Sequence, residues 1–164
     1  MSKKFPNRIL MVCMGNICRS PIAEAVMRAT IEKADLSHEW YVDSAGIEGW
    51  HSGCEADPRT LNVLANHNIK YNNRARVLLL QDFEQYDYIF GMDQSNMASL
   101  KRMAPQDCKA KLLLLGDFGL KPDDRIIEDP YYYVGEAPFE KIYEQCIIAC
   151  PNFLKQARSS QIRL

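Results

Sequence analysis

The sequence predicts a single-domain α/β fold: a doubly wound sheet of about four parallel strands with helices on both faces. Two observations support this prediction. Short apolar runs alternate with amphipathic stretches, and no repeat, low-complexity segment or linker divides the 164 residues, so one domain over residues 1–164 is expected. With 47% hydrophobic and 25% charged residues, the composition is that of an ordinary globular domain. In such sheets, ligands bind beyond the carboxyl ends of the strands.

Four apolar runs are the expected strands, near residues 8–14, 39–46, 86–92 and 111–115. Helices are expected over about 21–34, from Asp57–Pro58, after a cap at Asp93, and over about 139–157. A long loop is expected from 116 to 138. Pro151 should kink or break the last helix, because proline lacks a backbone donor and clashes with the preceding turn.

Composition limits the classes of function. The formal net charge is −1, so no global field attracts nucleic acid or a membrane surface, and any anion site must be local. The N-terminal residues hold no signal-peptide core and no run is long enough to span a bilayer, so a soluble cytoplasmic protein with reduced cysteines is expected. The three histidines lie near no cysteine pair, and neither a metal site nor a cofactor is expected.

A ten-residue stretch, VCMGNICRSP at 12–21, has the features of a phosphate-binding loop with its own nucleophile. An apolar run leads into Cys13, a Gly–Asn pair suits a tight turn, and Pro21 fits the first turn of a helix that Arg19 or Ser20 would cap. A cysteine and an arginine separated by five residues are a weak signal alone. The surrounding strand, turn and helix therefore support the prediction.

The chemistry expected of this loop is phosphoryl transfer. Backbone N–H groups of residues 14–19 and the positive end of the helix dipole would hold a phosphate dianion, with the Arg19 guanidinium as a bidentate partner. The same field favours a thiolate at Cys13, placed for in-line attack on phosphorus. The loop residues expected to bind the substrate are Met14, Gly15, Asn16, Ile17, Cys18 and Ser20.

A cysteine nucleophile that displaces an alcohol or phenol needs an acid to protonate the leaving oxygen. We predict that Asp129 is this acid, because Pro130 favours an extended conformation for it and three aromatic residues follow. The neighbouring carboxylates, including Glu128, are expected to lie in a solvated acidic turn. The aromatic residues would line a slot for a flat ring.

Three segments resemble those of the low molecular weight protein tyrosine phosphatases: VCMGNICRSPIAEAV at 12–26, DSAG at 43–46 followed by Trp50, and EDPYY at 128–132. The resemblance runs from about residue 8 to 158 and implies the phosphotyrosine phosphatase I-like fold. It also implies hydrolysis of phosphotyrosine and small aryl phosphates through a phosphocysteine intermediate on Cys13. Arg19 would bind phosphate, and Asp129 would act as general acid and then as base.

The resemblance implies supporting roles as well. Asn16 would hold the loop in a strained shape, Ser20 would hydrogen-bond the sulfur leaving group, and Ser44 would support Asn16. Cys18 would trap Cys13 in a reversible disulfide that protects it from irreversible oxidation. The residues expected to line the aromatic slot are Ile17, Trp50, Tyr131 and Tyr132, and the two tyrosines are also candidate phosphorylation sites.

The chain departs from the family pattern at two positions. Asn73 stands where the family usually places a histidine before its Ala–Arg pair. An amide cannot titrate as an imidazole can, so the polar network behind Asn16 is expected to differ in detail. Tyr133 adds a third aromatic residue to the usual pair.

Three alternatives remain open. An arsenate reductase on the same fold would need resolving thiols in a mobile mid-chain segment, but no cysteine lies between Cys54 and Cys108. A protein arginine phosphatase of the bacterial type tends to carry threonine where this chain has Ile17, whose apolar side chain suits a phenyl ring better. A non-catalytic, flavodoxin-like phosphate-binding module would make Cys13 incidental. The expected partners are phosphotyrosine-containing proteins, with inorganic phosphate as product, and the expected state is a monomer or weak self-association.

Overall fold

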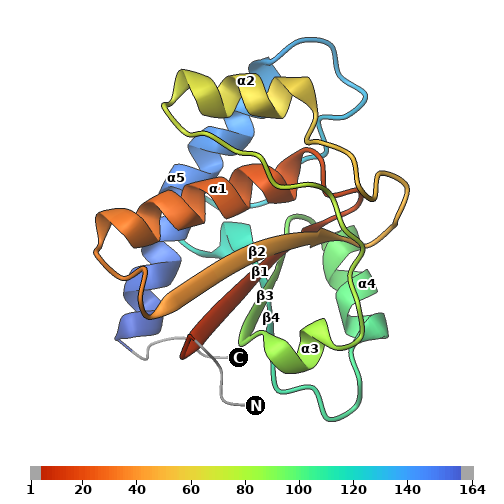
Figure 1. The fold of residues 1–164 in the computed structure, drawn as a ribbon, viewed down its shortest axis with the longest axis vertical. Helices are drawn as coiled ribbons and strands as arrows, with labels where there is room; N and C mark the ends of the chain where they lie inside the picture. The colour runs from red at the N-terminus through yellow and green to blue at the C-terminus, as the bar shows by residue number, and fades with distance from the viewer. Residues whose placement is uncertain (1–4, 160–164) are drawn as a thin grey trace.

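The computed structural model describes residues 5–159 and contains one sheet of four parallel strands in the order β2-β1-β3-β4 (Figure 1). The strands are β1 (Asn7–Cys13), β2 (Trp40–Gly46), β3 (Tyr88–Gly91) and β4 (Lys111–Leu114). The helices are α1 (Arg19–Lys33), α2 (Pro58–Asn66), α3 (Asp82–Gln85), α4 (Gln94–Met103), the 3-10 helix η1 (Leu115–Asp117) and α5 (Ala137–Arg158). The predicted fold class is confirmed.

Alternating side chains of β1 build both faces of the core. Ile9 and Met11 belong to the hydrophobic cluster that includes α1 and α5, whereas Leu10 and Val12 belong to the one that includes α3 and α4. All four are completely buried, because successive residues of a strand point to opposite faces and both faces are covered by helices. This arrangement fixes the central strand, and Cys13 is its last residue.

Helix α1 begins earlier than predicted, at Arg19 rather than Pro21. The expectation that Arg19 or Ser20 caps it was wrong, because both residues lie inside its first turn. The cap position belongs to Cys18, whose side chain makes no capping hydrogen bond. The first N–H groups of an α-helix have no intrahelical partner, so those of α1 face the loop that follows Cys13.

Pro151 does not break α5, which runs from Ala137 to Arg158 without interruption. Proline removes only one backbone donor, and Pro151 lies on the exposed side of the helix. The opposite side buries Cys146, Cys150 and Phe153 in the core. Packing of this apolar face stabilises the helix and offsets the hydrogen bond that is lost at Pro151.

Two short helices, α3 and η1, and an isolated bridge were not predicted. The four-residue helix α3 precedes β3, which begins at Tyr88 rather than at residue 86. The bridge joins Val77, in the segment between α2 and α3, to Gly46 at the end of β2. No helix within residues 5–159 combines the length and the hydropathy that a bilayer span requires.

Asp57 fixes the start of α2, as the sequence predicts. Its Oδ1 accepts a hydrogen bond from the Arg59 backbone N–H at 2.9 Å, with Pro58 as the first helical residue. The Arg59 guanidinium also donates to both carboxylate oxygens, from Nε at 3.0 Å and from Nη2 at 2.9 Å. Hydrogen bonds from the Arg59 side chain lower the pKa of Asp57, although burial opposes the shift.

We predict that Asp57→Ala lowers the free energy of unfolding by about 1 kcal/mol or more, since both the cap and the ion pair are lost. Asp57→Asn keeps a cap acceptor and should cost less. Because the folded-state pKa of Asp57 lies below the unfolded value, its charge stabilises the fold above about pH 4 and this contribution is lost as pH falls through the folded pKa. Urea unfolding at pH 7 and pH 3 measures this effect. The free energies of unfolding of wild type and Asp57→Asn should differ less at pH 3 than at pH 7.

Candidate active site

The loop between β1 and α1 lies at the carboxyl end of the central strand, where the fold class predicts a ligand site. Cys13 and Arg19 flank it, and both are almost completely buried. Asn16, in the middle, has a φ of 61°, in the left-handed region. Asparagine is one of the few residues with a side chain that adopts this conformation readily.

Three hydrogen bonds hold Asn16 in this conformation. Its Nδ2 donates to Ser20 Oγ at 2.8 Å and to Ser44 Oγ at 2.9 Å, and its Oδ1 accepts from the Arg76 backbone N–H at 3.0 Å. The Asn16 side chain thereby connects the loop to the start of α1, the end of β2 and the segment after α2. These contacts agree with the expected place of Ser44 behind the loop.

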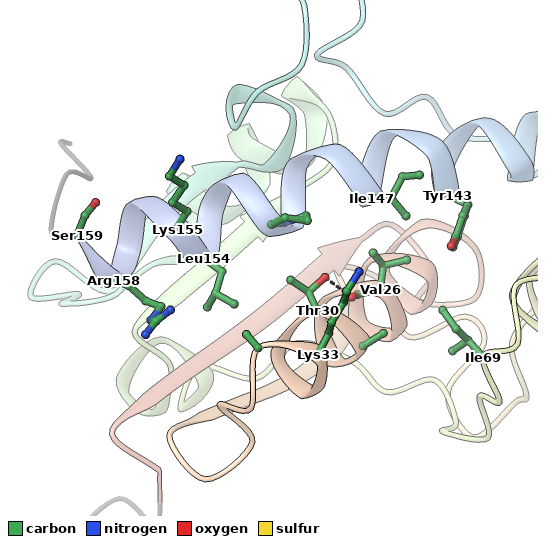
Figure 2. A pocket seen from close by; sticks show the side chains of 13 residues that line it. Val26, Thr30, Lys33, Ile69, Tyr143, Ile147, Leu154, Lys155, Arg158 and Ser159 are labelled. Carbon is green, nitrogen blue, oxygen red and sulfur yellow. Dashed lines mark hydrogen bonds between the residues drawn. The ribbon is translucent and has the colours of Figure 1, made fainter.

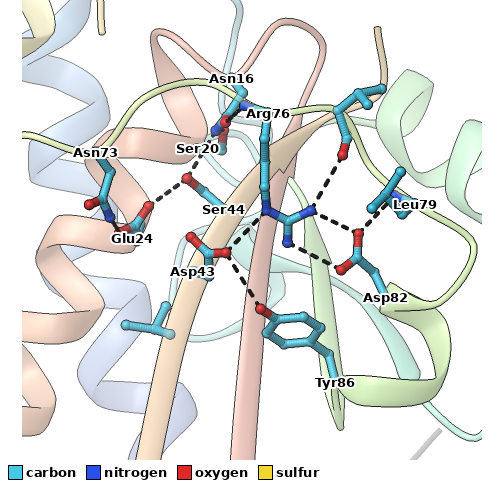
Figure 3. A network of polar contacts seen from close by, with 12 residues as sticks. Asn16, Ser20, Glu24, Asp43, Ser44, Asn73, Arg76, Leu79, Asp82 and Tyr86 are labelled. Atoms are coloured by element: carbon cyan, nitrogen blue, oxygen red, sulfur yellow. Dashed lines mark hydrogen bonds and ion pairs between the residues drawn. The ribbon is translucent and has the colours of Figure 1, made fainter. Parts of the chain in front are cut away.

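A buried carboxylate, Glu24, anchors the network behind Asn16 (Figure 3). Its Oε1 accepts hydrogen bonds from Ser44 Oγ at 2.5 Å and from Tyr71 Oη at 2.9 Å. Its Oε2 accepts from Asn73 Nδ2 at 2.6 Å and pairs with Arg28 Nη2 at 2.5 Å. Asn73 therefore reaches Asn16 only through Glu24 and Ser44, and the charge that balances Glu24 comes from Arg28.

The pKa of Tyr71 is raised, first by burial and then by the charge of Glu24, so its hydroxyl remains a donor to that carboxylate. Glu24 was not predicted from the sequence as a member of the site. A single acidic residue within the apolar pattern IAEAV of α1 was the signal that could have revealed it.

A second charged cluster fixes the segment that contains Arg76 (Figure 3). The guanidinium pairs with Asp82 from Nη1 at 3.0 Å and Nη2 at 3.2 Å, and with Asp43 from Nε at 3.2 Å. Tyr86 Oη donates to Asp43 at 3.5 Å, and burial, followed by the charge of Asp43, raises the pKa of Tyr86 to about 12. This cluster, which the sequence analysis also missed, holds the backbone N–H that reaches Asn16.

The nucleophile and cation candidates have defined partners. Cys13 Sγ lies 3.0 Å from Ser20 Oγ. Arg19 Nη1 donates to Asp93 Oδ2 at 2.6 Å and to the Ile127 carbonyl at 3.1 Å, and its Nη2 lies 3.6 Å from Asp129 Oδ2. Burial alone would lower the pKa of Arg19, but Cys13 and Asp93 raise it above its ordinary value. The guanidinium is thus charged and fixed beside the cysteine.

A cavity of about 250 Å³ opens over this loop. It contains Cys13, Arg19 and Asp129 together with the predicted aromatic wall, although Asp129 lies some 110 residues along the chain. The side chains of Asn16, Ser20, Ser44 and Asn73 do not line it, so the cavity wall lacks two of the residues expected to bind the substrate, Asn16 and Ser20. The lining residues are Cys13, Met14, Gly15, Ile17, Cys18, Arg19, Trp50, His51, Asp129, Tyr131 and Tyr132.

His51 is the one lining residue that the sequence analysis did not place there. Its ring lies against Tyr131, with 5.8 Å between ring centroids. A Cβ atom added at Gly15 would stand 2.9 Å from His51 Cδ2, so a larger residue there would displace the imidazole. Gly15 is therefore required for the close approach of His51 to the loop.

Cys18 differs from Cys13 in its surroundings. Burial, followed by the nearby Cys13, raises the pKa of Cys18 well above its ordinary value. Cys18 is therefore a neutral thiol at neutral pH.

A larger groove of about 810 Å³ lies elsewhere, between α1 and α5 (Figure 2). Apolar residues, Val26, Ile69 and Leu154 among them, share it with the three cations Lys33, Lys155 and Arg158. It contains no cysteine and no carboxylate. The smaller cavity over Cys13, in which a nucleophile, a cation and an acid meet, is therefore the candidate active site.

We predict that Asn16→Gly lowers the free energy of unfolding by about 1–3 kcal/mol, because it removes the three hydrogen bonds that the Asn16 side chain makes with Ser20, Ser44 and the Arg76 N–H. Asn16→Ala should cost about 1 kcal/mol more, because alanine also resists the left-handed conformation that glycine adopts freely. Thermal or urea unfolding of both variants measures this difference. Equal stabilities would show that the backbone conformation at position 16 is not maintained.

Comparison with known proteins agrees with this geometry. Residues 8–162 match the family described as low molecular weight phosphotyrosine protein phosphatase. The low molecular weight phosphotyrosine protein phosphatase 2 of Drosophila melanogaster is 68% identical over 154 residues, which cover 94% of each chain. The crystal structure of Primo-1 superposes with a TM-score of 0.90 at 53% identity, over 92% of this chain and 97% of that one.

A crystal structure described as drosophila arginine phosphatase superposes with a TM-score of 0.88 at 40% identity, over 92% of this chain and 97% of that one. The same fold and a related sequence thus occur in a protein named for a different phosphorylated side chain. Together with the match over residues 8–162, these likenesses show that the chain belongs to the low molecular weight phosphotyrosine protein phosphatase family.

Proposed function

We propose that this chain, as a member of that family, hydrolyses phosphotyrosine in phosphoproteins, and small aryl phosphates, through a phosphocysteine intermediate. The observation that supports this most directly is the meeting of Cys13, Arg19 and Asp129 in one cavity whose outer wall is aromatic. Inorganic phosphate is the product, and neither a metal nor a cofactor takes part. The cytoplasmic location and the monomeric or weakly associating state stay predictions from the sequence.

In the first step, the Cys13 thiolate attacks phosphorus while the bond from phosphorus to the phenolic oxygen breaks. Asp129 donates a proton to that oxygen, so tyrosine leaves as a neutral phenol. The loop N–H groups and Arg19 stabilise the charge on the transferring phosphoryl group. Arg19 is suited to this role because Asp93 and the Ile127 carbonyl already fix its guanidinium.

In the second step, a water molecule attacks the phosphocysteine while the Asp129 carboxylate accepts its proton. The sulfur–phosphorus bond breaks, and Cys13 leaves as a thiolate. Ser20 Oγ, at 3.0 Å from the sulfur, can donate a hydrogen bond that stabilises this leaving group. Asn16 and Ser44 serve the step indirectly, because they position Ser20 and the loop.

The walls of the cavity favour an aromatic substrate. Ile17, Trp50, Tyr131 and Tyr132 provide apolar and aromatic surface above the phosphate site. A flat phenyl ring buries such surface more completely than the polar guanidinium of phosphoarginine would. Phosphoarginine hydrolysis remains the second candidate, because of the likeness to the arginine phosphatase structure.

We predict that Cys13→Ser abolishes turnover of phosphotyrosyl peptides and aryl phosphates, since the variant has no thiolate to attack phosphorus. Asp129→Asn should slow hydrolysis of esters with poor leaving groups by about 10²- to 10⁴-fold, and slow those with acidic phenols far less. Steady-state rates over a series of aryl phosphates of increasing phenol pKa measure both effects.

Two results would contradict these assignments. Turnover by Cys13→Ser would show that Cys13 is not the nucleophile. It would favour the alternative in which the loop only binds phosphate and Cys13 is incidental. If Asp129→Asn hydrolyses esters with poor leaving groups as fast as wild type does, Asp129 is not the general acid, but the assignment of Cys13 as nucleophile stands. Matched phosphotyrosyl and phosphoarginyl peptides discriminate between the two substrates, and a higher kcat/KM for the phosphoarginyl peptide would overturn the proposed specificity.

We also predict reversible inactivation by peroxide. Peroxide oxidises the Cys13 thiolate to a sulfenic acid, and the Cys18 thiol then displaces water to form a disulfide with Cys13. Dithiothreitol should restore activity to oxidised wild type but not to Cys18→Ser, each compared with its own untreated rate. Cys54→Ser, which changes an exposed free cysteine, is the matched control. Sulfonic acid at Cys13 of oxidised wild type, without a disulfide, would contradict the prediction.

A further inference from the structure

Three consecutive residues beside the active site expose large apolar side chains. Tyr132 is 87% exposed, Tyr133 57% and Val134 97%, and we call them the apolar strap. Single apolar residues on a surface are ordinary, whereas contiguous apolar patches mark interaction sites. Trp50, which is 69% exposed and also lines the cavity, adds to the apolar surface around its mouth.

The backbone of the strap is anchored although its side chains are bare. Arg59 Nη1 donates to the Tyr133 carbonyl at 2.5 Å, and Nη2 donates to the Tyr131 carbonyl at 3.1 Å. The same guanidinium is held by Asp57 and lies 4.4 Å from the centroid of the Phe139 ring. A loop that is fixed from α2 and α5 presents its side chains in a defined arrangement, which lowers the entropic cost of binding a partner.

The strap is continuous with the candidate active site. Tyr132 lines the cavity over Cys13, and its ring packs edge to face on Tyr131 with 4.9 Å between centroids. A phosphotyrosine bound in that cavity would leave the residues next to it in the substrate chain at the mouth, beside the strap. The residues that meet the strap are therefore the flanking residues of the substrate.

The side chains of the strap favour one class of flanking residue in the substrate. Residues 130–135 are Pro, three Tyr, Val and Gly, so this segment offers no charged side chain to a charged flank. Apolar side chains laid against it would remove apolar surface from water on both partners, which is favourable at about 25 cal/mol per Å². An acidic or basic flank would lose hydration without gaining an ion pair from the segment.

We propose that the apolar strap is a recognition surface for apolar residues that flank phosphotyrosine in the protein substrate. This inference rests on the proposed function and adds a substrate class to it. The strap acts on the binding of polypeptides, whereas small aryl phosphates, which end at the ring, do not reach Tyr133 or Val134.

The test compares phosphotyrosyl peptides of equal length whose flanking residues on both sides are Leu, Ser or Asp. Wild type should hydrolyse the Leu peptide with a kcat/KM about tenfold above that of the Ser peptide, as expected for the burial of one or two apolar side chains. The double variant Tyr133→Ser/Val134→Ser should bring this ratio close to one. The substitutions keep the hydrogen bonds from Arg59, because main-chain carbonyl oxygens accept them. The rate of the double variant on an aryl phosphate should therefore equal that of wild type.

Leu80→Ser is the matched control. Leu80 is 67% exposed and lies two residues before α3. Figure 1 shows α3 at the opposite end of the molecule from the loop that precedes α5. This variant should leave both the peptide ratio and the aryl phosphate rate unchanged. A similar loss of the peptide ratio in Leu80→Ser would show that the strap has no special role.

Three further results would overturn the inference. Equal kcat/KM for the Leu, Ser and Asp peptides would show that the strap does not read the flanks. A loss of aryl phosphate turnover in the double variant would show that the strap shapes the catalytic cavity instead. Sedimentation velocity that finds a dimer for wild type but not for the double variant at assay concentration would assign the strap to a second copy of the chain. Hydrolysis of neither peptides nor aryl phosphates by wild type would instead refute the proposed function itself.

Discussion

The candidate site depends on the left-handed conformation of Asn16. This residue turns the chain between the end of β1 and the start of α1, and its side chain is the point where two otherwise separate polar clusters meet. One cluster surrounds Glu24 and the other surrounds Arg76 (Figure 3). Because the loop is short and its centre is strained, its N–H groups keep one arrangement only while both clusters hold it.

The buried charges behind the loop need hydrogen-bonding partners, because removing an ion from water costs free energy. Glu24 is completely buried and keeps four hydrogen-bonding partners, one of them the cation Arg28. A carboxylate so placed is stable only when its lone pairs are occupied, and loss of one donor would leave a buried charge under-satisfied. The Asn73 amide donates to one of these lone pairs, on Glu24 Oε2, and an amide does not titrate. Residue 73 therefore contributes no change of charge to the network near neutral pH.

The fold and much of the site could be predicted because their signals are local. The strand, turn and helix around Cys13 follow one another within about 25 residues, and the Asp129–Pro130 pair with its aromatic residues is contiguous in sequence. Glu24 has a local signal in the apolar pattern around it, but the partners of Glu24 and Arg76 could not be predicted, because they come from segments up to about 50 residues apart and ordinary surface ion pairs have the same composition. The helix start was misplaced because Arg19 and Ser20 have no local pattern that distinguishes the last loop residue from the first helical one.

Asp93 combines two tasks in one carboxylate. Its Oδ1 accepts from the Asn96 backbone N–H at 2.7 Å and caps α4, while its Oδ2 holds Arg19. At most helix starts Asp, Asn, Ser and Thr exchange with little loss, because a single acceptor is enough. Here the position needs two acceptor oxygens and a negative charge. An Asn, Ser or Thr at this position would keep the helix cap but remove the carboxylate that lies nearer to the buried guanidinium, at 2.6 Å against 3.6 Å for Asp129, so the negative charge at position 93 serves the active site rather than the helix.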